Sequence, residues 1–251
     1  MRISNGVAAI AVAAILGSPN LASGEEKKEF GIGSFSANVG LFSDYTYRGV
    51  SQTGQEPSLQ GGIDWAHDVG LYAGFWGSNI DFSDGNEAHV EVDVYAGYGS
   101  SFGKFSYDIN FLYYLYPGAS DSLDYDFWEV TPSVGYDFGF ASVGFGISFS
   151  PDFFGGSGDA QFYQSTVEVP LPAGFTVSGN VGYQAVDDNA TFALPDYLTW
   201  GVGVFFDLGT LNSKLSNFTI GADYVDTDID GNECGSENCD ARVVFNISVS
   251  F

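Results

Sequence analysis

Hydrophobic and polar residues alternate with a period of two along much of this chain. The stretch HVEVDVYAGY, residues 89–98, has valine at 90, 92 and 94 and polar or charged residues at 89, 91 and 93. Successive side chains of a β-strand point to opposite sides of the sheet, so this period predicts a strand with two unlike faces. The pattern alone leaves two alternatives. The valines pack inward in a soluble sandwich or lipocalin-like barrel, and they face lipid in a membrane barrel.

Similar runs recur between clusters of Gly, Pro, Asp and Asn, and they predict about twelve strands and almost no helix. An even number of strands suits a closed antiparallel barrel whose two chain ends lie on the same side. The predicted strands span residues 36–48, 58–66, 71–80, 89–98, 105–115, 127–138, 143–149, 163–169, 175–184, 198–206, 218–224 and 242–251.

The connections between these strands alternate between short and long. Short turns such as HDVG, DFGFA and PLPAG follow the even-numbered strands, although DLGTLNSKLSN is longer. Long, mostly acidic loops such as YPGASDSLDYD and VDTDIDGNECGSENCD follow the odd-numbered strands. Bacterial outer-membrane barrels combine short periplasmic turns with long external loops in this way.

Aromatic residues at the strand ends favour the membrane barrel over the soluble one, because lipid-facing barrels carry aromatic girdles at both interfaces. We therefore predict an all-β fold, a transmembrane up-and-down antiparallel β-barrel over residues 36–251. The strand-end aromatics are Tyr45, Tyr98, Tyr113, Tyr136 and Tyr224.

The N-terminal segment has the features of an export signal. Arg2 is followed by an apolar run from Val7 to Leu16 and by small residues at 22–24, which predicts a secretory signal peptide over residues 1–24. Residues 25–35, which include EEKKEF, then form a flexible lead-in. No later segment approaches the roughly 18 apolar residues of a membrane helix, so any insertion is by strands.

The chain is strongly acidic, with 32 Asp and Glu against 7 Lys and Arg and a formal net charge of −25 at pH 7. This charge excludes nucleic acid as a partner. It is explained either by solvated acidic loops or by a pore that attracts cations.

Several acids share the polar face of the predicted strands with one basic residue, Arg48. These residues predict a pore lining or constriction, and the alternative is a structural ion-pair network that braces the barrel. We expect a porin-like channel for passive diffusion of small hydrophilic solutes, with a preference for cations. The candidate lining residues are Asp44, Arg48, Glu91, Asp93, Asp108 and Glu129.

The last long loop contains both cysteines and a calcium-like pattern. Cys234 and Cys239 are expected to form a disulfide in an oxidising compartment. The segment DTDIDGNECGSE matches the spacing of a calcium loop, although its flanks are predicted strands, and a solvated loop pinned by the disulfide is the alternative. We expect no other cofactor. The pattern's carboxylates are Asp226, Asp228, Asp230 and Glu237.

The C-terminal segment VVFNISVSF ends on Phe251. It resembles the terminal strand of outer-membrane proteins, whose final aromatic residue is read by the barrel-insertion machinery. The resemblance implies that this machinery and outer-membrane lipid are partners, and that the protein resides in the outer membrane of a Gram-negative bacterium.

A wider resemblance covers residues 36–251. The segments SANVGLFSDYTYRGVSQT, PSLQGGIDW, GLYAGFWGSNIDF, YDINFLYYLYPG and SPDFFG resemble the TorF-like family of outer-membrane porins. The resemblance implies an exported porin-like barrel and supplies no substrate or catalytic residue. Its most specific positions are Tyr45, Arg48, Gly49, Ser51 and Gln52, then Gly74, Trp76, Gly77 and Ser78.

Two other classes of function compete with a channel. A hydrolase site on the barrel needs a nucleophile with a histidine base, but His67 falls in a short turn and His89 has no serine partner. We therefore expect no enzyme. A non-conducting structural or adhesive barrel remains the alternative, and the oligomeric state is left open.

Overall fold

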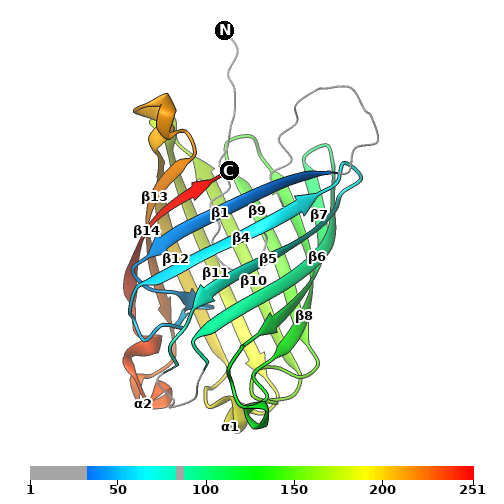
Figure 1. Ribbon diagram of the computed structural model, residues 1–251, viewed down its shortest axis with the longest axis vertical. Helices are drawn as coiled ribbons and strands as arrows, with labels where there is room; N and C mark the ends of the chain where they lie inside the picture. Colours follow the sequence, from blue (N-terminus) through cyan, green and yellow to red (C-terminus); the bar gives the residue numbers. More distant parts are fainter. Residues whose placement is uncertain (1–32, 83–87) are drawn as a thin grey trace.

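The computed structural model describes residues 33–82 and 88–251. Within them, twelve strands close into one antiparallel barrel in which β1 pairs with β14 (Figure 1). The expected signal peptide and most of the expected lead-in lie outside the described residues. The barrel strands are β1 (Ser34–Phe42), β4 (Ser58–Ala66), β5 (Leu71–Asn79), β6 (Val90–Phe102), β7 (Phe105–Leu115), β8 (Phe127–Asp137), β9 (Ser142–Ser150), β10 (Ala160–Pro170), β11 (Phe175–Val186), β12 (Tyr197–Asp207), β13 (Phe218–Thr227) and β14 (Arg242–Ser250).

Most of these strands overlap their predicted ranges, but the first prediction is wrong. Residues 36–48 do not form one strand, since β1 ends at Phe42 and a separate hairpin follows, made of β2 (Thr46–Tyr47) and β3 (Val50–Ser51). The chain reverses at Arg48 and Gly49, whose φ angles are 49° and 88°. A left-handed pair of residues forms a tight hairpin turn and cannot continue a strand.

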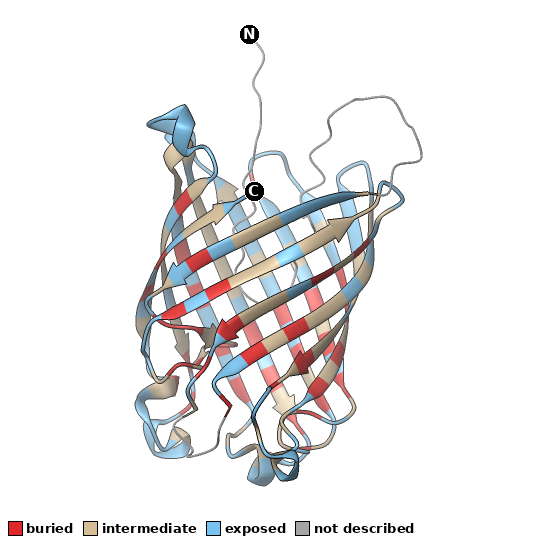
Figure 2. Ribbon diagram, viewed as in Figure 1, coloured by how far each residue is buried: buried red, intermediate tan, exposed pale blue. Residues whose placement is uncertain are grey.

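The two faces of the wall meet different surroundings. Outward positions carry large apolar side chains that the rest of the described chain leaves uncovered, such as Phe75, which is 60% exposed. Inward positions carry polar side chains, such as Gln184, which is 0% exposed. Figure 2 shows buried inward positions concentrated toward one end of the barrel. This distribution is the reverse of that in a soluble barrel, where the apolar face is inside.

The two ends of the barrel differ, as the alternating connections predicted. Short turns, η2 (Pro172–Gly174), η3 (Leu208–Thr210), η4 (Ser213–Leu215) and the C-terminus lie at one end (Figure 1). The long loops at the other end contain η1 (Asp121–Leu123), α1 (Asn189–Phe192), α2 (Gly231–Cys234) and η5 (Glu237–Cys239). None of the helices among residues 33–82 and 88–251 has the length and apolar character to cross a membrane.

Candidate functional site: the barrel lumen

The hairpin β2–β3 folds into the barrel near the long-loop end. A Cβ built on Gly49 at its tip would lie 2.4 Å from Oγ1 of Thr199 on β12 and 2.6 Å from Cγ2 of Thr227 on β13. Neither strand is a neighbour of β1 or β4, between which the hairpin is inserted. The hairpin therefore crosses the lumen and narrows it.

Arg48 fixes the tip of this hairpin to the wall. Its Nη2 donates to both carboxylate oxygens of Glu129 on β8, at 2.7 and 2.8 Å, and its Nη1 donates to Oε1 of Gln184 on β11 at 2.6 Å. The guanidinium carbon also lies 4.3 Å from the ring centroid of Phe162 and 4.6 Å from that of Tyr47. Arg48 thus reaches the lumen through an inserted loop and not, as the sequence analysis assumed, from a barrel strand.

A second arginine holds the base of the hairpin. Oδ1 of Asp44 accepts hydrogen bonds from Ser51 at 2.6 Å and Thr53 at 2.8 Å, while its Oδ2 accepts from Nη1 of Arg242 at 2.9 Å. Arg242 also donates to the carbonyl oxygens of Glu237 and Asp240. Arg242 therefore connects the base of the hairpin to the loop that carries η5.

Glu91 and Asp93, both on β6, lie beside the hairpin and have no basic partner within residues 33–82 and 88–251. The hydroxyl of Tyr45, in the loop before β2, donates to Oε1 of Glu91 at 2.6 Å. Burial, and then the charges of Glu91 and Asp93, raise the pKa of Tyr45 well above its ordinary value, so the phenol stays protonated and acts as a donor. Oδ1 of Asp93 is buried and has no hydrogen-bond partner in the described part of the chain.

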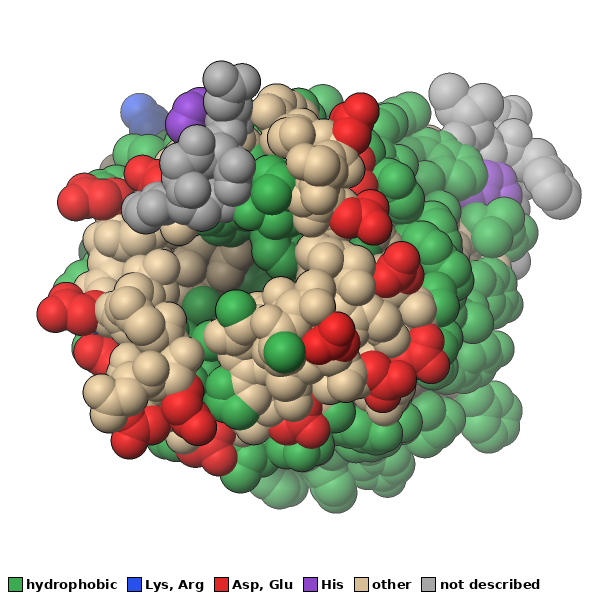
Figure 3. Space-filling model, turned by 90° about the horizontal axis from the view of Figure 1, so that it is seen from below, with side chains coloured by type: hydrophobic (Ala, Val, Ile, Leu, Met, Phe, Trp, Pro, Cys, Tyr) green, Lys and Arg blue, Asp and Glu red, His purple; other side chains and the backbone are tan. Residues whose placement is uncertain are grey.

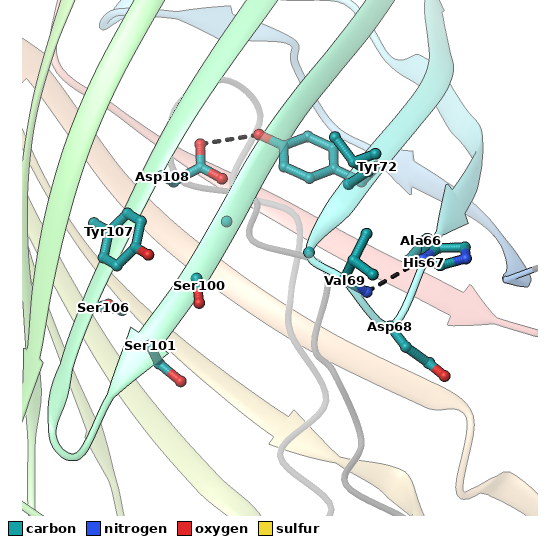
Figure 4. Close-up of a pocket in the computed structure, with 13 residues that line it drawn as sticks. Ala66, His67, Asp68, Val69, Tyr72, Ser100, Ser101, Ser106, Tyr107 and Asp108 are labelled. Atoms are coloured by element: carbon teal, nitrogen blue, oxygen red, sulfur yellow. Dashed lines mark hydrogen bonds between the residues drawn. The ribbon is translucent and has the colours of Figure 1, made fainter. Parts of the chain in front are cut away.

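Further acids on the same wall pair with tyrosines toward the short-turn end. The hydroxyl of Tyr95 donates to Oδ1 of Asp64, and that of Tyr72 donates to Oδ1 of Asp108 at 2.9 Å. Asp108 and Tyr72 line a cavity of about 330 Å³ at this end, where their side chains point toward each other (Figure 4). Asp108 therefore lies away from the hairpin, whereas Arg48 and Glu129 meet at its tip, and Glu91 and Asp93 lie close to it.

Inward aromatic rings lie flat over inward glycines of the wall. A Cβ on Gly74 would come within 2.6 Å of the Tyr95 ring, and one on Gly182 within 2.4 Å of the Phe162 ring. Such contacts exist only because glycine lets a ring approach the backbone, and they keep the rings out of the middle of the bore. Similar pairs are Tyr72 with Gly97, Phe42 with Gly40, and Phe205 with Gly203 and Gly221.

The mouth at the long-loop end is ringed by acids. Figure 3 looks onto this end and shows acidic side chains around the rim, apolar side chains around the outer wall, and a recess between the loops. An acidic rim of this kind raises the local concentration of cations at the entrance.

The long loop between β13 and β14 contains the expected disulfide between Cys234 and Cys239. Three carboxylates of the calcium-like pattern are engaged within the loop and its neighbours: Asp230 caps α2 by accepting from the amide of Asn232, Asp226 accepts from Tyr224, and Asp228 accepts from the amide of Leu198. No group of three His, Cys, Asp or Glu side chains suited to a metal ion occurs in the described part of the chain. Calcium binding by this loop stays a prediction.

Residues that sequence reasoning missed are Arg242, Gln184 and the glycine–aromatic pairs. Arg242 is two residues from Val244 and four from Asn246, which are both buried on the inward face of β14. The alternation of faces could therefore have placed Arg242 in the lumen. The partner of Gln184 depends on how the barrel closes, whereas Gly74 and Gly182 meet rings of neighbouring strands and depend on the strand register.

The chain is similar to a known protein family and to several solved structures. A family model described as "Bacterial protein of unknown function (Gcw_chp)" matches residues 28–251. No curated protein matches the chain by sequence. Among solved structures, the KdgM porin aligns with a TM-score of 0.59 at 10% identity, over 86% of this chain and 99% of that one. The NanC porin aligns with a TM-score of 0.56 at 11% identity, over 87% and 99%.

These likenesses show the fold. A KdgM porin structure described as a complex with disordered oligogalacturonate also aligns, with a TM-score of 0.55 at 8% identity, over 86% of this chain and 97% of that one. The porin-like barrel implied by the sequence resemblance is confirmed, while the family model that matches has a different name from the TorF-like family.

Proposed function

Because the chain belongs to the Gcw_chp family, whose function is unknown, its role has to be inferred from its own barrel, and we propose that it is a porin-like channel of the bacterial outer membrane. The channel passes small hydrophilic solutes by passive diffusion and prefers cations. We also propose that the chain is related to the TorF-like family, that Phe251 takes part in insertion into the outer membrane, and that the barrel has no catalytic activity.

The observation that carries the proposal is the contrast between the two faces of the closed wall. Apolar side chains cover the outside, which suits lipid, while the inside is polar and carries many carboxylates. The arginines of the described lumen, Arg48 and Arg242, are both engaged with carboxylates. The remaining acids leave the bore negative, which favours cations over anions. These inward acids are Asp64, Glu91, Asp93, Asp108, Glu168 and Asp223.

The solute class proposed here differs from the ligand named for one structural neighbour. That KdgM porin is described in complex with oligogalacturonate, a chain of uronic acids whose carboxylates are negative at neutral pH. An acidic bore repels such a polyanion, so we expect this chain to exclude it.

A non-conducting structural or adhesive barrel is the second candidate, and the crowded long-loop end favours it. Tyr45, Tyr114, Phe127 and Phe153 are buried there around the inserted hairpin. A bore blocked at this level would carry no current.

Planar-bilayer recordings separate the two candidates. The purified protein is reconstituted in a neutral bilayer under a tenfold KCl gradient, and the reversal potential is measured. We expect discrete conductance and a reversal potential whose sign shows that K⁺ passes more readily than Cl⁻. In the Asp93→Asn/Asp108→Asn double variant we expect a weaker preference for K⁺ over Cl⁻. An absence of conductance would support the structural barrel, and anion selectivity would overturn the proposal.

A further inference from the structure

Glu91 and Asp93 lie beside the hairpin with no basic partner among the described residues, and this points to a class of solute. We propose that the wall formed by β5, β6 and β7 binds organic ammonium groups at Asp93, and that linear di- and polyamines are solutes of this lumen. The inference rests on the proposed channel function for the claim that these amines pass through the lumen. Their binding at Asp93 can be tested without measuring conduction.

The first argument is the charge balance of the buried acids. Glu91 is 1% exposed and Asp93 is 7% exposed, and no described residue forms a hydrogen bond with Oδ1 of Asp93. The nearby arginine, Arg48, is occupied by Glu129 and Gln184, and Arg242 is occupied by Asp44 and two carbonyl oxygens. A buried carboxylate without a counter-charge is unfavourable, and a cation from outside the described chain would relieve that cost.

The second argument is the aromatic surroundings, which favour an organic cation. In the sheet register, Asp93 lies directly between Trp76 on β5 and Tyr114 on β7, and side chains at paired positions share one face. The ring of Tyr45 lies 5.3 Å from that of Trp76. Aromatic rings attract ammonium groups through their negative faces, and the described residues offer no group of three side chains suited to a metal ion.

The third argument is the spacing of the acids along the same wall. Glu91 and Asp93 are two residues apart on β6, a step of about 7 Å. Asp64, on the neighbouring strand β4, is hydrogen-bonded to Tyr95 at the next level, and Asp108 on β7 pairs with Gly99 farther along. A linear polyamine, whose ammonium groups are separated by short alkyl chains, can meet successive carboxylates of such a row. Several moderate contacts also allow the solute to leave again.

A calorimetric titration tests the binding directly. Spermidine is titrated into the detergent-solubilised full chain at pH 7, and we expect saturable binding that Asp93→Asn weakens about tenfold, the loss of one charged contact. Asp68→Asn, which removes an exposed acid in the short turn between β4 and β5, serves as the matched control and should change affinity less than about twofold. Heat-modifiable gel mobility verifies that each variant is folded, and Glu91→Gln replaces Asp93→Asn if the latter does not fold.

The outcomes separate this inference from the channel proposal. Spermidine binding that Asp93→Asn and Glu91→Gln leave unchanged would overturn the site, as would an absence of binding to the wild-type chain, which would mean that the two acids share a proton. Preferential binding of calcium in a parallel titration would overturn the ammonium class. A cation-selective current together with any of these results would leave the channel standing, whereas spermidine binding without current would keep the site and reject the channel.

Discussion

Arg48 and Glu129 are 81 positions apart in the sequence, and inside the barrel Nη2 of Arg48 lies 2.7 Å from Oε2 of Glu129. The contact joins the tip of the inserted hairpin to β8. Because the hairpin crosses the lumen, this ion pair holds the hairpin in place within the bore.

Removing one partner of this buried pair should destabilise the barrel. Glu129→Gln leaves a buried guanidinium without a counter-charge, a loss of about 3–5 kcal/mol for buried pairs in general. The double variant Arg48→Gln/Glu129→Gln removes both charges and should recover part of that loss. Urea unfolding of the reconstituted barrel measures both effects. Equal unfolding midpoints for the wild type and Glu129→Gln would show that the pair does not hold the hairpin.

The glycine–aromatic contacts should control the width of the bore. Gly74→Ala places a methyl group within 2.6 Å of the Tyr95 ring, so the ring has to move toward the lumen. We expect lower single-channel conductance at a stability cost of about 1–3 kcal/mol. Gly77→Ala is the control on the same strand, because position 77 faces outward and its Cβ would meet only the carbonyl oxygen of Glu91, at 3.1 Å. A conductance unchanged by Gly74→Ala would argue against rings lying along an open path.

The accessibility of the disulfide to a labelling reagent tests the orientation of the barrel in the outer membrane. The chain has only two cysteines, and they are joined in a long loop. A membrane-impermeant maleimide should label intact cells only after mild reduction. In a Cys234→Ser/Cys239→Ser background, Lys104→Cys on a short turn should be labelled only once the outer membrane is permeabilised. The opposite pattern would invert the proposed topology.

Phe251 should matter for assembly more than for the folded barrel. Its side chain is 73% exposed, and its amide donates to the carbonyl oxygen of Ala37 at 2.8 Å. Phe251→Ala keeps this backbone contact, so refolding into detergent should be unaffected. In cells we expect a severalfold lower yield in the outer-membrane fraction, whereas a normal yield would remove Phe251 from the insertion signal.

The alternation of side chains was sufficient to predict the barrel, because the apolar face of each strand can be identified from that strand's sequence alone. The bounds of β4 and β7 match the predicted ranges, and the connections alternate between short and long except between β12 and β13, where residues 208–217 contain η3 and η4. The inserted hairpin could not be predicted in this way. Alternation continues from β1 past Phe42, and the reversal at Arg48 and Gly49 leaves no periodic signal.

The site was only partly predictable for a related reason. Parity placed Glu91, Asp93, Asp108 and Glu129 on the inner face, but it contains no information on distance across the lumen. The contact of Arg48 with Gln184, 136 positions away, depends on closure of the barrel and on the path of the hairpin.

The central claim is that the apolar face meets lipid and the acidic face lines the bore, and fluorescence quenching in brominated lipid tests it most directly. The chain has four tryptophans, and variants that keep one and replace the others by Phe can be compared in the same vesicles. Trp200 faces outward on β12, whereas Trp76 faces the lumen beside Asp93. We predict strong quenching of Trp200 and little quenching of Trp76 by lipids brominated on their acyl chains. Equal quenching of the two, or stronger quenching of Trp76, would contradict the assignment of the two faces.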